Sequence, residues 1–241
     1  MNDTFYHLIV GVIDLFLWGG ELVGEENLPQ HGPAVFVANH LDATGPIATA
    51  CSLPLRIHTW IIADMMDKDL APVWLQGDFT ERQLHLRPPV SRWAAQALCR
   101  IAVPLFYGLG CVPVYRGDYE RMQDTLRMSM DVLREGKFLM VFPEDNRLPT
   151  DPVTKMQPFQ HTFVRLAEMY YEETGERLEF YPIAIHASGY VKVGKALAHN
   201  PLNPAGLERR RFKNLMEQTI IGMYLQMSKD EYLGELTPQH K

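Results

Sequence analysis

Two groups of polar residues that could do chemistry each follow an apolar run of the chain. His40 and Asp42 come just after residues 34–38, and the cluster Pro-Glu-Asp-Asn-Arg at 143–147 follows residues 137–142. An imidazole titrates near neutral pH, so His40 is a candidate general base. Short apolar runs predict buried strands, and open α/β sheets bind ligands at the carboxyl ends of their strands. We therefore expect both groups at one edge of a sheet.

The elements that must position these groups alternate along the chain. Apolar runs and helical periodicity predict strands at 34–38, 57–62, 112–116, 137–142 and 179–185, and helices at 46–51, 92–106, 122–133 and 163–170. This order is typical of an α/β domain with a mostly parallel central sheet flanked by helices. Residues 64–89 show no clear periodicity and indicate a lid or a surface helix pair.

Composition favours one α/β domain with additions. The 241 residues contain no linker rich in Gly, Ser or Pro, so we expect an apolar N-terminal helix in 1–20, the α/β domain in 21–205 and an amphipathic helix in 206–241. The net charge of −6 gives no reason to expect a nucleic-acid partner. The three cysteines lack Cys-x-x-Cys spacing, which indicates neither a disulfide framework nor a zinc site and favours a reducing compartment.

The segment 5–18 is strongly apolar but fits neither a secretory signal nor a membrane span. No basic residue precedes it, it is shorter than the roughly 20 residues that a spanning helix needs, and it contains Asp14. Its pattern fits insertion at a membrane surface and docking on the domain's own core equally well. The three arginines at 209–211 indicate a solvated helix face, with contact to anionic lipid as the alternative.

Four short blocks occur in order along the chain: Asn39-His40, Gly110-Cys-Val-Pro-Val-Tyr-Arg116, Phe142-Pro-Glu-Asp-Asn-Arg147 and Tyr181-Pro-Ile-Ala-Ile185. Together they resemble the glycerolipid and lysophospholipid acyltransferase superfamily, and most of all its 1-acylglycerol-3-phosphate acyltransferases. The resemblance runs from about residue 24 to about residue 201 and includes a late strand at 191–195. It implies an O-acyltransferase that acts on a lysophospholipid or a lipid-like acceptor.

The resemblance also implies roles for individual residues. Transfer of an acyl group from acyl-CoA or acyl carrier protein needs a base at the acceptor hydroxyl, and this role falls to His40. In the family, the arginine of the second block and the glutamate of the third help to hold the acceptor, and Arg116 and Glu144 stand at those positions. Arg147 could join Arg116 in clamping a phosphate, because the guanidinium fork matches a phosphate group.

Simpler interpretations of these residues stay open. Arg116 could pair with Asp118 or Glu120, and Glu144 could cap the turn that follows it. The resemblance further implies an acyl thioester donor, a lipid acceptor and a membrane surface as partners, with acyl carrier protein as an alternative donor. It implies neither a cofactor nor a metal, and it places the protein in the cytoplasm, on the cytoplasmic face of a membrane.

Two positions depart from the family pattern. The first block normally reads His-x4-Asp, with a carboxylate that orients the imidazole, but the fifth residue after His40 is Gly45. Asp42 is a candidate substitute, although an N-cap for the next helix explains it equally well. The third block normally has Gly-Thr where Asp145 and Asn146 stand, and an aspartate adds bulk and negative charge there. Either the acceptor is no simple phosphate monoester, or Asp145 replaces the missing acid.

Acyl transfer with His40 as base is therefore the predicted function, and two alternatives stay open. One is a catalytically impaired family member that binds an acyl-lipid or a partner protein. The other is acyl transfer to an unusual acceptor, such as an amino-acid lipid or a polyketide-type alcohol. Metal-dependent hydrolysis fits poorly, because no Glu/His pair at helical spacing accompanies the first block. The candidate catalytic residues are His40 and Asp42, and the candidate substrate-binding residues are Asn39, Arg116, Glu144, Asp145 and Arg147.

Overall fold

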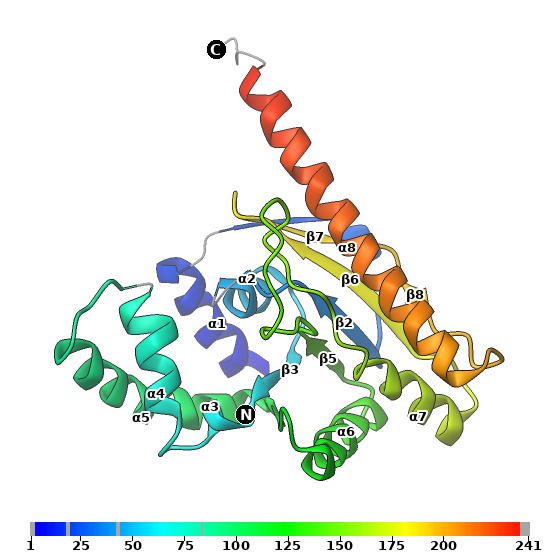
Figure 1. Cartoon of the computed structure of the whole chain (residues 1–241), viewed down its shortest axis with the longest axis horizontal. Coiled ribbons are helices and arrows are strands. Elements are labelled where there is room, and N and C mark those ends of the chain that lie inside the picture. Colours follow the sequence, from blue (N-terminus) through cyan, green and yellow to red (C-terminus); the bar gives the residue numbers. More distant parts are fainter. Residues whose placement is uncertain (1–2, 18–19, 42–43, 83, 237–241) are drawn as a thin grey trace.

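The computed structural model describes residues 3–17, 20–41, 44–82 and 84–236 and has the predicted α/β architecture (Figure 1). The described strands form one eight-stranded sheet in the order β1-β7-β6-β2-β5-β3-β4, with β8 beside β6. They are β1 (Glu21–Val23), β2 (Ala34–Ala38), β3 (Ile57–Ile62), β4 (Val112–Val114), β5 (Phe138–Val141), β6 (Glu179–Ile185), β7 (Tyr190–Val193) and β8 (Leu197–Ala198). Strands β2, β3 and β6 span the predicted residues, and β4 and β5 are shorter than predicted.

The central strands are parallel, which is what positions the polar groups. Strand β2 pairs in parallel with both β5 and β6, and β3 pairs in parallel with both β5 and β4. Only the edge is mixed, because β7 and β8 run antiparallel to β6. Every residue of β2 is buried, as expected for a parallel strand that is covered on both faces.

Helices cover the two faces of the sheet. The described helices are α1 (Asp3–Leu17), α2 (Thr44–Ser52), α3 (Ala63–Met66), α4 (Ala71–Trp74), α5 (Val90–Leu109), α6 (Tyr119–Arg134), α7 (Val164–Thr174) and α8 (Ala205–Leu236). Val35 and Val37 of β2 face a core built with α6, α7 and α8. Phe36 points the other way, into a second core that includes Ala48 of α2. This alternation follows from the period of two in a strand.

Residues 63–81 are mostly helical and pack on α5 as a separate small layer at the surface (Figure 1). It contains α3, α4 and a π-helix at Leu75–Glu81. A small apolar cluster joins it to α5 through Ala71, Leu75, Ala95 and Cys99. Helices of four to seven residues give too few turns for a clear periodicity. Helix α5 itself extends beyond the predicted 92–106.

The N-terminal helix α1 docks on the protein with one side only. Tyr6 and Val10 are buried and the helix lies against α2, whereas Leu8 and Val12 are 62% and 52% exposed. Docking on the core therefore occurs, and insertion into a membrane surface stays a prediction. No helix in the described parts of the chain is long and apolar enough to cross a membrane.

Helix α8 buries the face that its sequence predicts and runs on past the sheet (Figure 1). The buried residues include Phe212, Met216 and Ile220. Two of the three neighbouring arginines are paired within the protein: Arg209 with Glu168 and Arg211 with Glu208. These pairs agree with a solvated helix face as the interpretation of residues 209–211.

Candidate active site

The parallel topology brings the ends of four strands to one edge of the sheet. In the order β2-β5-β3-β4, these ends deliver His40, the segment 142–147, Asp64 and Arg116. The two groups that the sequence predicts to meet do so directly, because β2 and β5 are neighbours. The third group, at Arg116, lies two strands further along, so its contribution depends on where its side chain points.

Asn39 ties the ends of two strands together. Its side chain is fully buried, with Nδ2 donating to the Ile185 carbonyl at 3.0 Å and Oδ1 accepting from the Ile185 N–H at 2.7 Å. The amide thus continues the parallel ladder between β2 and β6 past the last paired residues. These bonds fix the position from which His40 leaves the strand, while contact between Asn39 and substrate stays a prediction.

His40 is half-buried, and a carboxylate from the neighbouring strand end holds its backbone. Its ring packs edge-on against Phe142, with the ring centres 5.3 Å apart. The His40 N–H donates to Glu144 Oε1 at 2.6 Å, and the other oxygen of Glu144 accepts from the Gln157 N–H at 2.9 Å. Glu144 is only 6% exposed. The carboxylate therefore fastens the His40 turn to the segment around Gln157, and its predicted contact with the acceptor stays a prediction.

The backbone explains why no acid stands five residues after His40. The Gly45 N–H donates to the His40 carbonyl at 3.0 Å, and Gly45 is buried against that peptide. A Cβ atom at Gly45 would lie 2.0 Å from the His40 carbonyl oxygen, well inside contact distance. The acid of the family pattern therefore does not fit this turn. Asp42, the other candidate acid, lies outside the described residues.

Restoring the family's acid is thus expected to fail. Gly45→Asp should displace the His40 peptide, lower the free energy of unfolding by about 1–3 kcal/mol as overpacked substitutions do, and give no gain in acyl transfer. Gly45→Ala tests the contact alone, because it adds the clashing Cβ without a charge. Thermal unfolding and turnover of both variants check this, and an aspartate variant that is as stable as the wild type and faster would contradict it.

Asp145 and Arg147 form a forked ion pair with each other. Arg147 Nε and Nη2 donate to the two oxygens of Asp145 at 2.8 and 2.7 Å, and the Arg147 N–H adds a bond at 3.2 Å. The hydrogen bond from the Arg147 side chain is the main reason why the pKa of Asp145 lies far below its usual range, against the effect of burial. The described contacts of Asp145 thus give no support to an orienting role at the imidazole.

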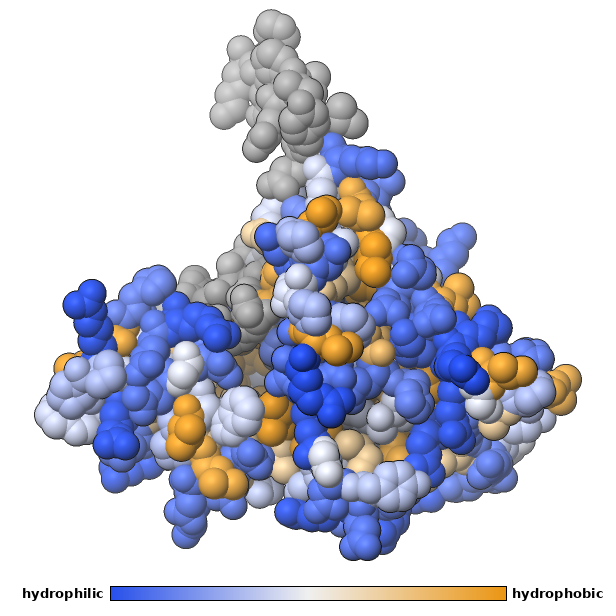
Figure 2. Space-filling model, in the orientation of Figure 1, coloured by the Kyte–Doolittle hydropathy of each residue, from blue (hydrophilic) through white to orange (hydrophobic). Residues whose placement is uncertain are grey.

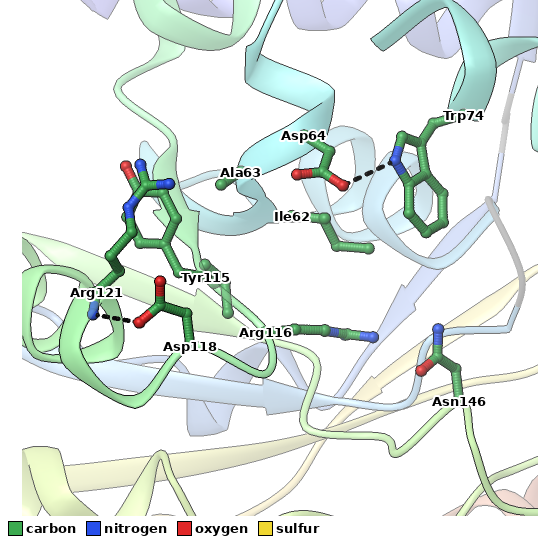
Figure 3. Close-up of a pocket in the computed structure, with 10 residues that line it drawn as sticks. Ile62, Ala63, Asp64, Trp74, Tyr115, Arg116, Asp118, Arg121 and Asn146 are labelled. Atoms are coloured by element: carbon green, nitrogen blue, oxygen red, sulfur yellow. Dashed lines mark hydrogen bonds between the residues drawn. The ribbon is translucent and has the colours of Figure 1, made fainter. Parts of the chain in front are cut away.

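Arg116 lines a cavity of about 330 Å³ beside this edge (Figure 3). Its side chain extends towards Asn146, which belongs to the segment that follows β5, the neighbour of the His40 strand (Figure 3). No carboxylate among the described residues lies within ion-pair distance of Arg116. Asp118, one proposed partner, instead caps α6 by accepting from the Arg121 N–H at 3.0 Å.

Electrostatics at Arg116 suit an anionic ligand. Desolvation by surrounding protein atoms lowers the pKa of Arg116, although the residue is exposed. The charge of Asp145 raises this pKa, that of Arg147 lowers it and that of Glu144 raises it. A partly desolvated guanidinium without a close counterion gains more from a bound phosphate or carboxylate than one in open water. The arrangement therefore provides an anion-binding guanidinium at the same edge of the sheet as the His40 turn.

Two further cavity residues come from a region that sequence reasoning left unassigned. Asp64 follows β3 directly and accepts a hydrogen bond from Trp74 Nε1 at 3.3 Å (Figure 3). Asp64 and Trp74 line the same cavity as Asn146. Asn146 belongs to the third sequence block, but it is not among the candidate site residues. The signal that was available for Asp64 is its place immediately after a predicted strand, as for His40.

Comparisons with known proteins agree with this arrangement. A family model described as Acyltransferase matches residues 80–186, which include Arg116 and the segment 142–147 but not His40. The crystal structure of the 1-acyl-sn-glycerophosphate (LPA) acyltransferase PlsC from Thermotoga maritima is similar over 95% of this chain and 84% of that chain, with a TM-score of 0.54 and 14% sequence identity. No curated protein sequence gives a significant match.

Proposed function

We propose that the chain is a member of the glycerolipid acyltransferase superfamily and that it moves a fatty acyl group from acyl-CoA or acyl carrier protein to the hydroxyl of a lysophospholipid or lipid-like acceptor. The match of residues 80–186 to an acyltransferase family model and the fold shared with PlsC support this proposal. The predicted α/β fold is confirmed, and the family model described as Acyltransferase agrees with the predicted family over residues 80–186. The donor, the acceptor and the base are our proposals. We further propose that the reaction takes place on the cytoplasmic surface of a membrane.

His40 is the proposed base. Its imidazole takes the proton of the acceptor hydroxyl as the oxygen attacks the thioester carbonyl, the C–S bond then breaks, and the leaving thiolate receives a proton from the imidazolium. The single observation that carries this proposal is the 2.6 Å bond from the His40 N–H to the buried Glu144. It fixes a histidine at the same carboxyl edge of the parallel sheet at which Arg116 lines a cavity.

Arg116 is the proposed binding residue for an anionic group of the acceptor. Strands β2 and β4 are three strand spacings apart, or about 14 Å, so a small acceptor reaches both residues only because Arg116 points back towards Asn146. Arg147 contributes less to phosphate binding than a clamp of two arginines would require, because Asp145 already neutralises its charge. This favours an acceptor that carries one anionic group held by Arg116.

Replacing Arg116 tests the acceptor site. Arg116→Gln should raise KM for an anionic acceptor about 10-fold to 100-fold, in line with the loss of a charged hydrogen bond, while KM for the thioester donor stays unchanged. Arg116→Lys should recover part of the loss, because an ammonium keeps the charge but not the fork. Arg127→Gln, an exposed arginine on α6 that pairs with Asp124, is the matched control. Equal KM values in all variants would remove Arg116 from the site.

The donor and acceptor can be identified in one assay. Thiol release is measured from a panel of acyl-CoA and acyl-carrier thioesters, with and without a lipid extract, and the products are analysed by mass. Release that requires the extract establishes acyl transfer, and the modified lipid identifies the acceptor. An amino-acid lipid or an alcohol as the modified product would select the unusual-acceptor alternative.

A catalytically impaired, ligand-binding protein is the second candidate function. The observation that favours it is Gly45, because the contact with the His40 peptide leaves no room for the acid that orients the imidazole in the family. An imidazole that lacks its orienting acid can lose about 10⁴ in rate. Saturable binding of acyl-CoA without thiol release from any donor would select this candidate.

A further inference from the structure

An exposed apolar stripe runs along α5. Val90, Trp93 and Ile101 are 52%, 65% and 68% exposed, and the exposed Ala97 and Pro104 lie between and beyond them. With 3.6 residues per turn, these five positions fall within an arc of about 80°. A soluble helix usually turns such an arc towards the core, so its exposure calls for an explanation.

The stripe is not available for packing within the described chain. The opposite side of α5 buries Ser91, Ala95 and Cys99, and this side carries the contacts with α4 and the π-helix. The apolar stripe therefore points outwards as a consequence of how α5 is anchored. Figure 2 also shows hydrophobic side chains at the surface over the α3–α4 part of this layer, at the lower left.

The charge of this segment has the opposite sign to that of the whole protein. Residues 82–117 contain no aspartate or glutamate in a chain of net charge −6, and they contain five arginines: Arg82, Arg87, Arg92, Arg100 and Arg116. On α5 itself, Arg100 is exposed at the edge of the stripe, whereas the exposed Arg92 lies on the flank nearer to the buried side. The nearby acids Asp67 and Asp69 lie towards the buried side, where they add to the effect of burial in raising the pKa of Cys99.

We propose that the outer face of α5 docks the protein on an anionic lipid bilayer. Exposed tryptophan and tyrosine next to arginine is the combination that suits the boundary between headgroups and acyl chains, and α5 supplies Trp93 and Tyr107, which is 64% exposed, with Arg100 at the edge of the stripe. Apolar insertion and attraction to anionic headgroups together hold a protein more firmly than either alone. The role of this docking in catalysis rests on the proposed function. The test of the docking measures vesicle binding and does not depend on that function.

The position of α5 relative to the cavity supports a lipid surface as the partner. Val73 of α4 is 71% exposed, and the next residue, Trp74, lines the cavity. The chain that leaves α5 enters β4 and reaches the cavity again at Arg116. A bilayer against this layer would thus lie beside the proposed acceptor site, from which a lipid could enter without crossing water.

Helix α1 is the competing surface for membrane contact. It exposes Leu8 and Val12, but the helix contains Asp14 and neither lysine nor arginine. Attraction to anionic lipid therefore distinguishes α5 from α1. The two helices make different predictions, because binding through α5 depends on anionic lipid and on salt, and binding through α1 does not.

The test is co-sedimentation of the full chain with phosphatidylcholine vesicles, with and without about a quarter phosphatidylglycerol. We expect the wild type to prefer the anionic vesicles and to lose this preference at high salt. The variant Arg100→Gln should weaken binding to anionic vesicles about five-fold. Trp93→Ser/Ile101→Ser should weaken binding about tenfold or more to both vesicle types.

Matched controls separate α5 from general effects. Leu202→Ser/Leu207→Ser replaces two side chains that are 80% and 62% exposed elsewhere, Arg177→Gln/Arg210→Gln removes two exposed arginines elsewhere, and Leu8→Ser/Val12→Ser tests α1. Thermal unfolding confirms that each variant folds. Controls that bind like the wild type support the proposal. Equal binding of the wild type to both vesicle types, α5 variants that bind like the wild type, or loss in the α1 variant alone would overturn it.

The test also distinguishes this inference from the proposed function. Acyl transfer is measured in parallel with short-chain substrates that are dispersed in water. Binding that depends on α5 without any acyl transfer would refute the proposed reaction and leave the docking surface standing. Acyl transfer by variants whose α5 changes do not affect vesicle binding would refute the docking surface and leave the reaction standing.

Discussion

Replacing His40 by alanine is expected to lower the rate of acyl transfer by about 10²-fold to 10⁴-fold while leaving the fold intact. The expected rate loss follows from removing the only proposed base. The intact fold follows from the hydrogen bond to Glu144, which comes from the backbone N–H of His40 and is kept by an alanine. Because the ring is half-buried beside Phe142, its removal leaves no large enclosed cavity.

The measurement is thiol release with the acceptor that the lipid-extract assay identifies, at saturating donor. His31→Ala, which changes an exposed histidine before β2, is the control and should retain the full rate. Melting temperatures of both variants should lie close to that of the wild type. A His40→Ala protein with undiminished acyl transfer would contradict the proposed mechanism. If neither the wild type nor His40→Ala transfers acyl groups and both bind acyl-CoA equally well, the ligand-binding alternative is favoured.

The sheet could be predicted from the sequence because its central strands are short, apolar and buried on both faces. Strand β2 is the clearest case, since all of its residues are buried and its predicted ends match the observed ones. Strands β1 and β8 have three and two residues, and runs of this length give no periodicity. Their place in the sheet is set by pairing with distant strands, which no local pattern contains.

The candidate site could be predicted only as far as strand ends identify it. His40 and Glu144 follow strands that are neighbours, so their contact follows from a parallel sheet. The hydrogen bond from the His40 backbone N–H to Glu144 depends on the path of the turn, and so does the exclusion of a side chain at Gly45. The pair of Asp145 with Arg147 is local, yet the sequence does not distinguish it from two groups that both face a substrate.

Glu144 is expected to be the residue whose loss affects both stability and catalysis. Its two oxygens accept from the N–H groups of His40 and Gln157 at 2.6 and 2.9 Å, inside the protein. Glu144→Ala leaves both donors without their partner, and the free energy of unfolding should fall by about 2–5 kcal/mol. Glu144→Gln is not conservative here, because its NH₂ group faces one of the two donors; a loss of about 2 kcal/mol is expected.

The catalytic effect should act through the position of His40. A misplaced base loses rate steeply, and we expect Glu144→Gln to lower kcat about 10-fold to 100-fold well below its melting temperature. Glu208 supplies the matched control, because it is also buried, accepts from the Asn200 N–H at 2.8 Å and lies on α8. Glu208→Gln should destabilise the protein by a similar amount without slowing acyl transfer.

A double-mutant cycle separates positioning from a general structural effect. In a His40→Ala background, Glu144→Gln should still destabilise the protein but should lower the residual rate no further, because the base on which it acts is gone. Additive losses of rate would instead indicate that Glu144 contacts the acceptor directly, as the family resemblance implies. A Glu144→Gln enzyme as fast as the wild type would show that the carboxylate holds the turn only for stability, and that the position of His40 is set by Asn39 and Gly45 alone.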